Sequence, residues 1–389
     1  MYCKKCGAPK TVTLRQKDHY CDLCFMTSAN HKFRACLGKN KVLSPNENVL
    51  IGLSGGPASA VLLDLVHYGL SLDNNKKLRI IPHFIHLYDD KEHNCAMAVL
   101  EQCKQYNSQC YFAHISDFMK IDIQLPEPNS IPQKDEHISN QYKEMLCSLS
   151  ATSAEDFISK VKRNLFIKYA RKLNCNVVFT AEITNILAMN LLSNIVLGRG
   201  SQVQNDVGFS DVRDVAVKIL RPMRDINKEE LNYYTAIRNI RPISHEVKRP
   251  HNLQSTIGLF VDDLQENFQS TISTVCKTAD KIGFLEQHNT LKSKDFKLSA
   301  LEATNFSRTV SFGQSQQKIN ESHVNNDDLS MFPHIHEHLC YTCSRNYLET
   351  DKSKLPQHIQ NFLINRYLEQ KENLRMSSTN RIGLRLPSR

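Results

Sequence analysis

Two cysteine pairs near the N-terminus have the spacing of a metal site. Cys3 and Cys6 form one Cys-x2-Cys pair, Cys21 and Cys24 form a second, and fourteen residues separate them. Two such pairs can place four thiolates in a tetrahedron, which is the coordination that structural Zn²⁺ prefers. Four cysteines also suit an iron–sulfur cluster, which is the alternative. The spacing predicts a zinc ribbon over residues 1–40.

A third Cys-x2-Cys pair, Cys340 and Cys343, lies near the other end of the chain. Two thiols are too few for a closed site, but His334, His336 and His338 precede them and could complete it. The pair is therefore a candidate second metal site, and two unliganded thiols are the alternative.

Positive charge is concentrated in the predicted ribbon. Residues 1–41 contain nine Lys and Arg but only two Asp, in a chain whose formal net charge is +9. A basic terminal module suits a polyphosphate partner, because each neutralised phosphate releases counterions. A solvated basic surface without a partner is the plainer alternative. The hypothesis of a nucleic-acid contact rests on Lys4, Lys5, Lys10, Arg15 and Lys17.

The composition indicates a globular protein of a reducing compartment. The chain has 389 residues, 41% of them hydrophobic and 23% charged, which suffices for two or three domains. It contains no apolar run of the roughly 20 residues that a membrane helix needs, and its first residues do not resemble a secretory signal. The thirteen cysteines are then expected as thiols rather than disulfides, and we expect the protein in the cytoplasm.

A glycine turn follows the first strongly apolar segment. Residues 47–53 (ENVLIGL) predict a buried strand, and Ser54-Gly55-Gly56-Pro57-Ala58-Ser59 comes directly after it. Glycines let the backbone bend tightly and bring N–H groups against an anion, at the positive end of the helix that Pro57 begins. Ser54, Gly55, Gly56 and Ser59 are therefore candidate nucleotide-binding residues.

Strands and helices alternate from this turn onward, which predicts a doubly wound α/β domain with a parallel sheet over residues 45–245. Further strands are expected at 78–87, 109–115, 176–181 and 214–220, and helices at 57–68, 92–105, 154–173, 184–197 and 227–238. Three prolines among polar residues predict a long loop or insertion over about 117–153. A helical, partly flexible insertion is expected over 246–333, with one helix from about 252 to 281, and a C-terminal segment with a helix over 334–389.

The glycine turn resembles the pyrophosphate loop of the N-type ATP pyrophosphatases (the PP-loop family, of HUP-type fold), which include tRNA-thiolating enzymes. Four further features restrict the resemblance to one group within this family: the preceding four-cysteine ribbon, the later Cys-x2-Cys pair, Asn194–Gly200 (NIVLGRG) and Arg221–Asp225 (RPMRD). Together they resemble the second subunits of the eukaryotic wobble-uridine thiolases. The resemblance covers about residues 1–245 and 338–350.

The resemblance implies a subunit required for 2-thiolation of the wobble uridine (mcm5s2U) in tRNAs for Lys, Glu and Gln. It implies a heterodimer with a related catalytic subunit, in which an iron–sulfur cluster could reside. The implied sulfur donor is a thiocarboxylated ubiquitin-related modifier, and no membrane is involved.

Three departures from the active members of this family determine the expected role. Ala58 stands where active loops carry Asp, so ATP binding by this chain is in doubt. Residues 151–154, where active members open a helix with Cys-x2-Cys, contain no cysteine, and neither does the segment Ile243–His245, where a further catalytic cysteine falls. A sulfur carrier needs a thiolate. We therefore expect a non-catalytic subunit; an ATP-dependent adenylating thiolase and a zinc-dependent RNA-binding protein without a thiolation role are the alternatives.

Overall fold

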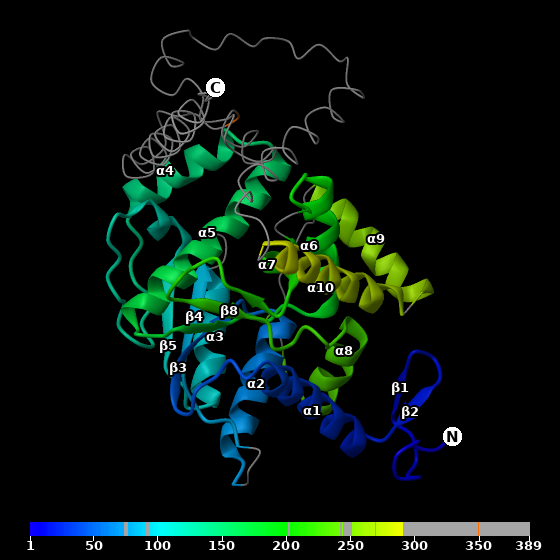
Figure 1. The fold of residues 1–389 in the computed structure, drawn as a ribbon. Coiled ribbons are helices and arrows are strands. Elements are labelled where there is room, and N and C mark those ends of the chain that lie inside the picture. The colour runs from blue at the N-terminus through cyan, green and yellow to red at the C-terminus, as the bar shows by residue number, and fades with distance from the viewer. Residues whose placement is uncertain are drawn as a thin grey trace, which may run out of the picture.

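A six-stranded sheet forms the centre of the molecule (Figure 1). The computed structural model describes residues 1–73, 77–90, 93–200, 203–241, 243, 251–268, 270–290 (281–290 as backbone) and 349. The strand order is β5-β4-β3-β6-β8-β7, and every pairing is parallel except that of β7 with β8. The strands are β3 (Glu47–Leu53), β4 (Ile80–Tyr88), β5 (Cys110–His114), β6 (Val177–Phe179), β7 (Ser210–Asp211) and β8 (Lys218–Leu220).

Helices cover both faces of this sheet, as a doubly wound fold requires. α1 (Asp22–Asn40), α2 (Pro57–Ser71), α3 (His93–Gln105) and α8 (Lys228–Ile237) share one apolar core with the sheet. α4 (Glu136–Cys147), α5 (Ala151–Lys172) and the 3₁₀ helix η1 (Ile115–Met119) share the core on the other face. A strand covered on both faces must be apolar along its length, and β3 is buried from Val49 to Leu53. The predicted fold class is confirmed.

The N-terminal segment is a small hairpin followed by a long helix. β1 (Val12–Leu14) pairs with β2 (Asp18–Tyr20), and the hairpin projects from the body near the start of α1 (Figure 1). The second cysteine pair does not form a hairpin turn of its own, because α1 begins at Asp22. Phe25, Phe33 and Leu37 of this helix pack in the core of the α/β domain.

Two expected elements differ in the structure. The predicted loop over 117–153 contains η1 and α4, because Asp135 caps a new helix by accepting a hydrogen bond from the N–H of Ile138 at 3.2 Å. The single helix expected over 252–281 is two helices, α9 (Leu253–Asn267) and α10 (Thr271–Thr290). Also unforeseen were β7 and α7 (Val203–Val207), which are too short to give a periodic signal.

Packing explains the break between α9 and α10. Val261 of α9 and Ala279 of α10 belong to one apolar cluster, built on α6 (Thr184–Val196) and α7. In a straight helix, eighteen residues would separate them by about 27 Å. The chain therefore has to turn after Phe268 to bury both faces on the same patch.

The rest of the expected C-terminal organisation lies outside the described residues. This applies to residues 291–348, with Cys340 and Cys343, and to residues 350–389. In the part that the structure describes, no helix combines the length and the apolar character that a bilayer crossing requires.

Candidate functional site

The structure brings Cys3, Cys6, Cys21 and Cys24 together at the base of the hairpin. One sulfur from each lies within 4.8 Å of all the others, and the sulfurs of Cys6 and Cys21 are 3.6 Å apart. A tetrahedron with Zn–S bonds of about 2.3 Å has S···S edges of about 3.8 Å. The four thiols therefore fit a single tetrahedral metal ion with little rearrangement.

The local backbone explains how the two pairs meet. Gly7 has a φ of +73°, and its N–H donates to the Cys3 carbonyl at 2.9 Å, which closes a tight turn between the first two thiols. Cys21 is the N-cap of α1, and Cys24 lies in the first turn of that helix. One pair thus sits on a turn and the other on a helix start.

Without a metal, the thiols of Cys3 and Cys24 differ in acidity. Burial opposes ionisation of Cys3, but backbone hydrogen bonds, the strongest from Cys21, lower the pKa of its thiol to about 6. Hydrogen bonds shared with Cys6 and Cys21 raise the pKa of Cys24 to about 12. A metal that binds all four as thiolates must therefore displace protons, so its affinity falls as the pH falls.

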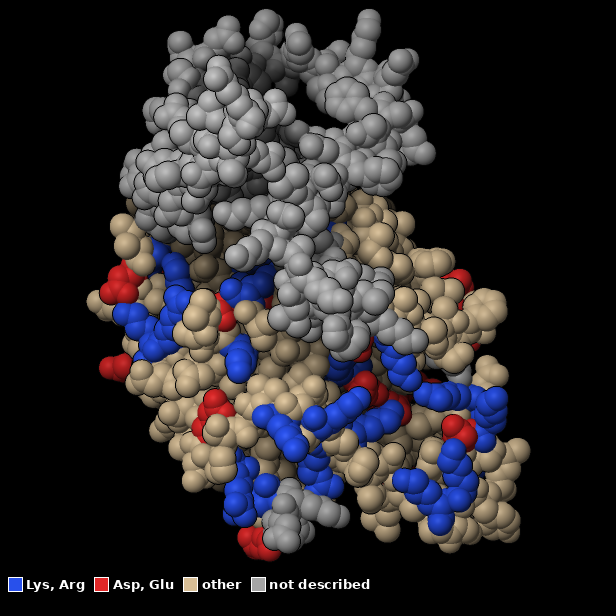
Figure 2. All heavy atoms as spheres, viewed as in Figure 1, with Lys and Arg blue, Asp and Glu red and all other residues tan. Residues whose placement is uncertain are grey.

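The five basic residues expected to contact nucleic acid all lie on or beside this hairpin, where Lys and Arg gather at the lower right of Figure 2. Lys4 pairs with Asp18 at 2.7 Å, and this hydrogen bond raises the pKa of the ammonium. Lys10 contacts the sulfur of Met1 at 3.2 Å. Arg15 occupies the turn with a φ of +52°. Lys5 and Lys17 have no acidic partner among the described residues, so their charges are available.

The glycine turn lies between β3 and α2, at the carboxyl edge of the sheet. Gly55 has a φ of +80°, a conformation that favours glycine, and Gly56 caps α2 with Pro57 as its first residue. The turn also bonds to itself. Ser54 Oγ accepts from the N–H of Gly56 at 3.4 Å and donates to Ser59 Oγ at 3.3 Å.

A cavity of about 740 Å³, here called the loop cavity, opens beside this turn. Ser54, Gly56, Pro57 and Ala58 line it, whereas Gly55 and Ser59 do not. Two of the four candidate nucleotide-binding residues thus face the cavity and two support the turn from behind.

The walls of the loop cavity are mainly apolar, and none of the described residues that line it is a cysteine. Helix α5 contributes Glu155, Lys162 and Phe166 to the wall, but no residue of 151–154. These three residues were not foreseen, although their spacing of seven and four residues puts them on one helix face. The thiol of Cys95 lies behind the turn, bonded to the Ser54 carbonyl at 3.8 Å, and is only 5% exposed.

The segment after α8 returns to the turn. Ile243 donates its backbone N–H to the Gly55 carbonyl at 3.1 Å, and its side chain packs near Gly55. Ile243 therefore lies beside the glycine turn, while Ser244 and His245 lie outside the described residues.

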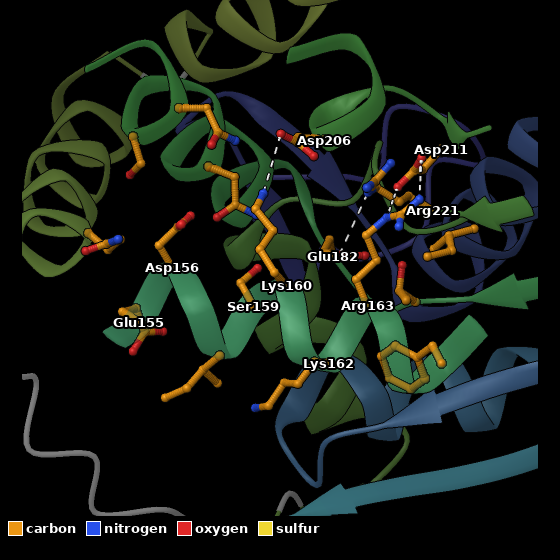
Figure 3. A pocket seen from close by; sticks show the side chains of 18 of the residues that line it. Glu155, Asp156, Ser159, Lys160, Lys162, Arg163, Glu182, Asp206, Asp211 and Arg221 are labelled. Carbon is orange, nitrogen blue, oxygen red and sulfur yellow. Dashed lines mark hydrogen bonds and ion pairs between the residues drawn. The ribbon is translucent and has the colours of Figure 1, made fainter. Parts of the chain in front are cut away.

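A second cavity of about 310 Å³ lies next to the first and is lined largely by ionic side chains (Figure 3). Arg163 donates to Asp211 at 2.6 and 3.1 Å, and Arg213 donates to the same carboxylate at 2.7 and 2.9 Å. Burial opposes ionisation of Asp211, but these arginines hold its pKa well below the usual range. Arg199 forms a two-pronged pair with Asp156 that is buried on both sides.

Comparison with known proteins assigns the chain to a family. Its residues 252–345 match the family model described as cytoplasmic tRNA 2-thiolation protein 2. The protein of that name from Anopheles gambiae is 33% identical over 294 residues, which are 72% of this chain and 70% of the relative. The Drosophila ananassae protein is 31% identical and is matched over 88% of this chain and 89% of its own length. This chain belongs to the cytoplasmic tRNA 2-thiolation protein 2 family.

A solved structure agrees with the fold. The U34-tRNA thiolase NcsA from Methanococcus maripaludis, determined with its [4Fe-4S] cluster, superimposes with a TM-score of 0.56 at 18% identity, over 72% of this chain and 88% of that one. The family assignment confirms the resemblance seen in the sequence, and the family's name carries the compartment that we expected.

Proposed function

We propose that this chain is the non-catalytic subunit of a complex that thiolates the wobble uridine of tRNAs for Lys, Glu and Gln. Family membership supports the thiolation role, and the loop cavity supports the division of labour. The single observation that carries the proposal is a pyrophosphate-type loop beside a cavity of about 740 Å³ in which Ala58 replaces the acid and no described lining residue offers a thiol. Without a thiolate the cavity has no group to carry sulfur.

In this proposal the chemistry belongs to a related catalytic subunit, which forms a heterodimer with this chain and takes sulfur from a thiocarboxylated ubiquitin-related modifier. The hairpin supplies tRNA contacts through Lys4, Lys5, Lys10, Arg15 and Lys17. Two of these, Lys5 and Lys17, lack an acidic partner among the described residues, as a phosphate-binding side chain should.

We propose zinc as the ion of the N-terminal site, where it would hold the hairpin against the start of α1. The donor set of four sulfurs also suits a [4Fe-4S] cluster. Elemental analysis and the visible spectrum of the anaerobically purified chain separate the two. About one zinc per chain and no absorption near 400 nm are expected, and four irons with a brown chromophore would contradict the assignment.

The test of the function is the tRNA of cells that lack this protein. Mass spectrometry of digested total tRNA should show the loss of 2-thiouridine and its return on expression of the wild-type chain. The purified chain alone should convert no ATP to AMP and pyrophosphate. Normal 2-thiouridine in the deletion strain would reject the thiolation role, and sulfuration of tRNA by the isolated chain would reject the non-catalytic one.

A further inference from the structure

Neither the metal site nor the glycine turn makes use of the second cavity. It lies between α5, α6 and the strand pair β7–β8, and it shares a wall with the loop cavity. Glu155, Lys162, Phe166 and Glu182 line both spaces. A ligand in one cavity is therefore within reach of a ligand in the other.

The two motifs that follow the glycine turn in sequence meet at this second cavity. Asn194 and Leu197 of the first motif and Arg221 of the second line it, although twenty-three residues separate Leu197 from Arg221. Arg199 of the first motif is locked by Asp156, which itself lines the cavity. The motifs thus build one wall rather than two separate features.

The polar groups of this wall are held in fixed positions before any ligand arrives. The side chain of Asp211 is fully buried and holds both Arg163 and Arg213, each of which stays 27% exposed. Arg163 uses Nε and Nη2 for this carboxylate, and its Nη1 takes part in no hydrogen bond with the described residues. A guanidinium fixed along one edge offers its other N–H groups at little entropic cost.

The charges of the lining decide which ligand fits. Five basic and five acidic side chains line the cavity, so it offers no net charge to attract a phosphate. Asn190, Asn194 and Gln254 add amide donors and acceptors, and the ring of Phe166 adds an aromatic surface, for which Gly52 leaves room. An uncharged planar ligand with donors and acceptors along its edge suits this wall, and a volume of about 310 Å³ admits it. A nucleobase has this chemistry.

We propose that the second cavity holds one unstacked nucleobase of the bound tRNA. The inference rests on the proposed function, since it takes tRNA as the partner. Lys160 and Lys162, one on each side of Val161 in α5, both line the cavity, and Lys160 lies 4.0 Å from Asp206; in this proposal Lys162 would contact the backbone that flanks the base. No described residue of the lining is a cysteine, so the cavity itself offers no thiolate that could carry sulfur to the base.

The test fills the cavity without disturbing its ionic wall. Ser159 lines the cavity from an exposed position of α5, and Ser159→Phe puts a ring where the base would lie. Asn140→Phe, at an exposed position of α4 outside the cavity, is the matched control. Equilibrium binding of an unmodified tRNA transcript to the full-length chain is measured over a range of salt concentrations. Ser159→Phe should weaken binding about ten-fold, in the range of a lost base contact, with an unchanged salt slope.

A second measurement does not depend on affinity. A tRNA carrying 4-thiouridine should crosslink to peptides of α5 and α6 in the wild type and in Asn140→Phe, and lose this crosslink in Ser159→Phe. Unchanged affinity and crosslinking in Ser159→Phe would overturn the proposal. A shallower salt slope would also overturn it, because it would assign the cavity to phosphate. If Ser159→Phe behaves like the wild type while the wild-type chain supports thiolation in cells, only the base site is rejected. If the wild-type chain binds no tRNA, the base site and the proposed tRNA contacts of the hairpin are both rejected, whereas the thiolation role is still decided by the 2-thiouridine of the deletion strain.

Discussion

The N-terminal cysteine site and the loop cavity differ in what each provides: the first has reactive side chains on a small scaffold, and the second has a well-formed scaffold with few reactive side chains. At the N-terminus the reactive groups are complete, with four sulfurs within 4.8 Å, on a scaffold of only a hairpin and a helix start. At the carboxyl edge of the sheet the scaffold is complete, with its glycine turn and capped helix, but Ala58 and a wall without described thiols leave little to react. The four cysteines could hold a metal ion, whereas the α/β domain offers a scaffold whose loop cavity has no thiol among its described lining residues.

Loss of one sulfur ligand should have the largest effect. Cys21→Ser removes a ligand at the N-cap of α1, and a site of three thiolates should lose its metal and the order of the hairpin. Metal content should fall from about one ion per chain to nearly none. Cys147→Ser, at an exposed thiol of α4, is the control and should keep its metal. Equal metal content in both variants would remove the first half of the comparison.

Loss of the ion pairs that line the second cavity should have the next largest effect. This change tests whether these pairs stabilise the scaffold of the α/β domain. Asp211→Asn leaves Arg163 and Arg213 without their shared charge, and removal of one partner of a buried pair costs about 3–5 kcal/mol of unfolding free energy. Urea unfolding measures this change. Asp122→Asn, which removes an exposed partner of Lys172, is the control and should change the urea midpoint far less, because solvent screens an exposed ion pair.

The same carboxylate predicts how stability depends on pH. Because the pKa of Asp211 is lower in the folded state than in the unfolded chain, its contribution is complete above about pH 5 and is lost as the pH falls through and below about 4. Urea midpoints between pH 3 and 7 should therefore fall less steeply in Asp211→Asn than in the wild type. Parallel curves would show that the ionised carboxylate is not what the arginines stabilise.

Charge reversal on the hairpin should give a moderate effect. Lys5→Glu with Lys17→Glu alters two side chains that have no acidic partner in the described part of the chain. If both contact phosphate, tRNA binding should weaken by more than ten-fold, and the salt slope should drop by about two. The same reversal at Lys77 and Lys104, outside the hairpin, serves as control. An unaltered slope would make the hairpin a structural element only.

Restoring the acid of the loop should change least. Ala58→Asp returns a carboxylate to the loop cavity, yet the wall still lacks a thiol among its described residues. We expect no release of pyrophosphate and no sulfuration of tRNA by the variant alone. Measurable turnover would show that a single residue separates this chain from an active thiolase.

Strong local signals made much of the fold predictable. β3 was predicted at its observed bounds, because a strand covered on both faces is apolar along its length. The clustering of the four N-terminal cysteines was predictable because their spacing is itself the signal. The two cavities were not, because Glu155, Lys162 and Asp211 acquire their roles only when α5, α6 and β7 meet.

The elements that the sequence did not predict, α4 and the turn between α9 and α10, also depend on contacts or signals outside a single periodic segment. Prolines in the first half of residues 117–153 hid the helix that Asp135 caps in the second half. The turn after Phe268 contains neither glycine nor proline that would predict it. The chain turns there because α9 and α10 both pack on the apolar patch of α6 and α7. Sequence periodicity reports on a single element, so a bend imposed by a neighbouring element leaves no trace in it.

α1 makes the N-terminal module an integral part of the body. One uninterrupted helix of nineteen residues, about 28 Å long, carries Cys24 in its first turn and buries Phe33 and Leu37 beneath the sheet. The helix fixes the distance and the direction from the four-cysteine cluster to the sheet, so a nucleic acid bound at the hairpin would be held in one orientation relative to the α/β domain. A module joined by a flexible linker would only raise the local concentration of the bound nucleic acid, whereas α1 holds the hairpin at a set distance. Insertion of one residue into α1 would rotate the hairpin by about 100° relative to the α/β domain.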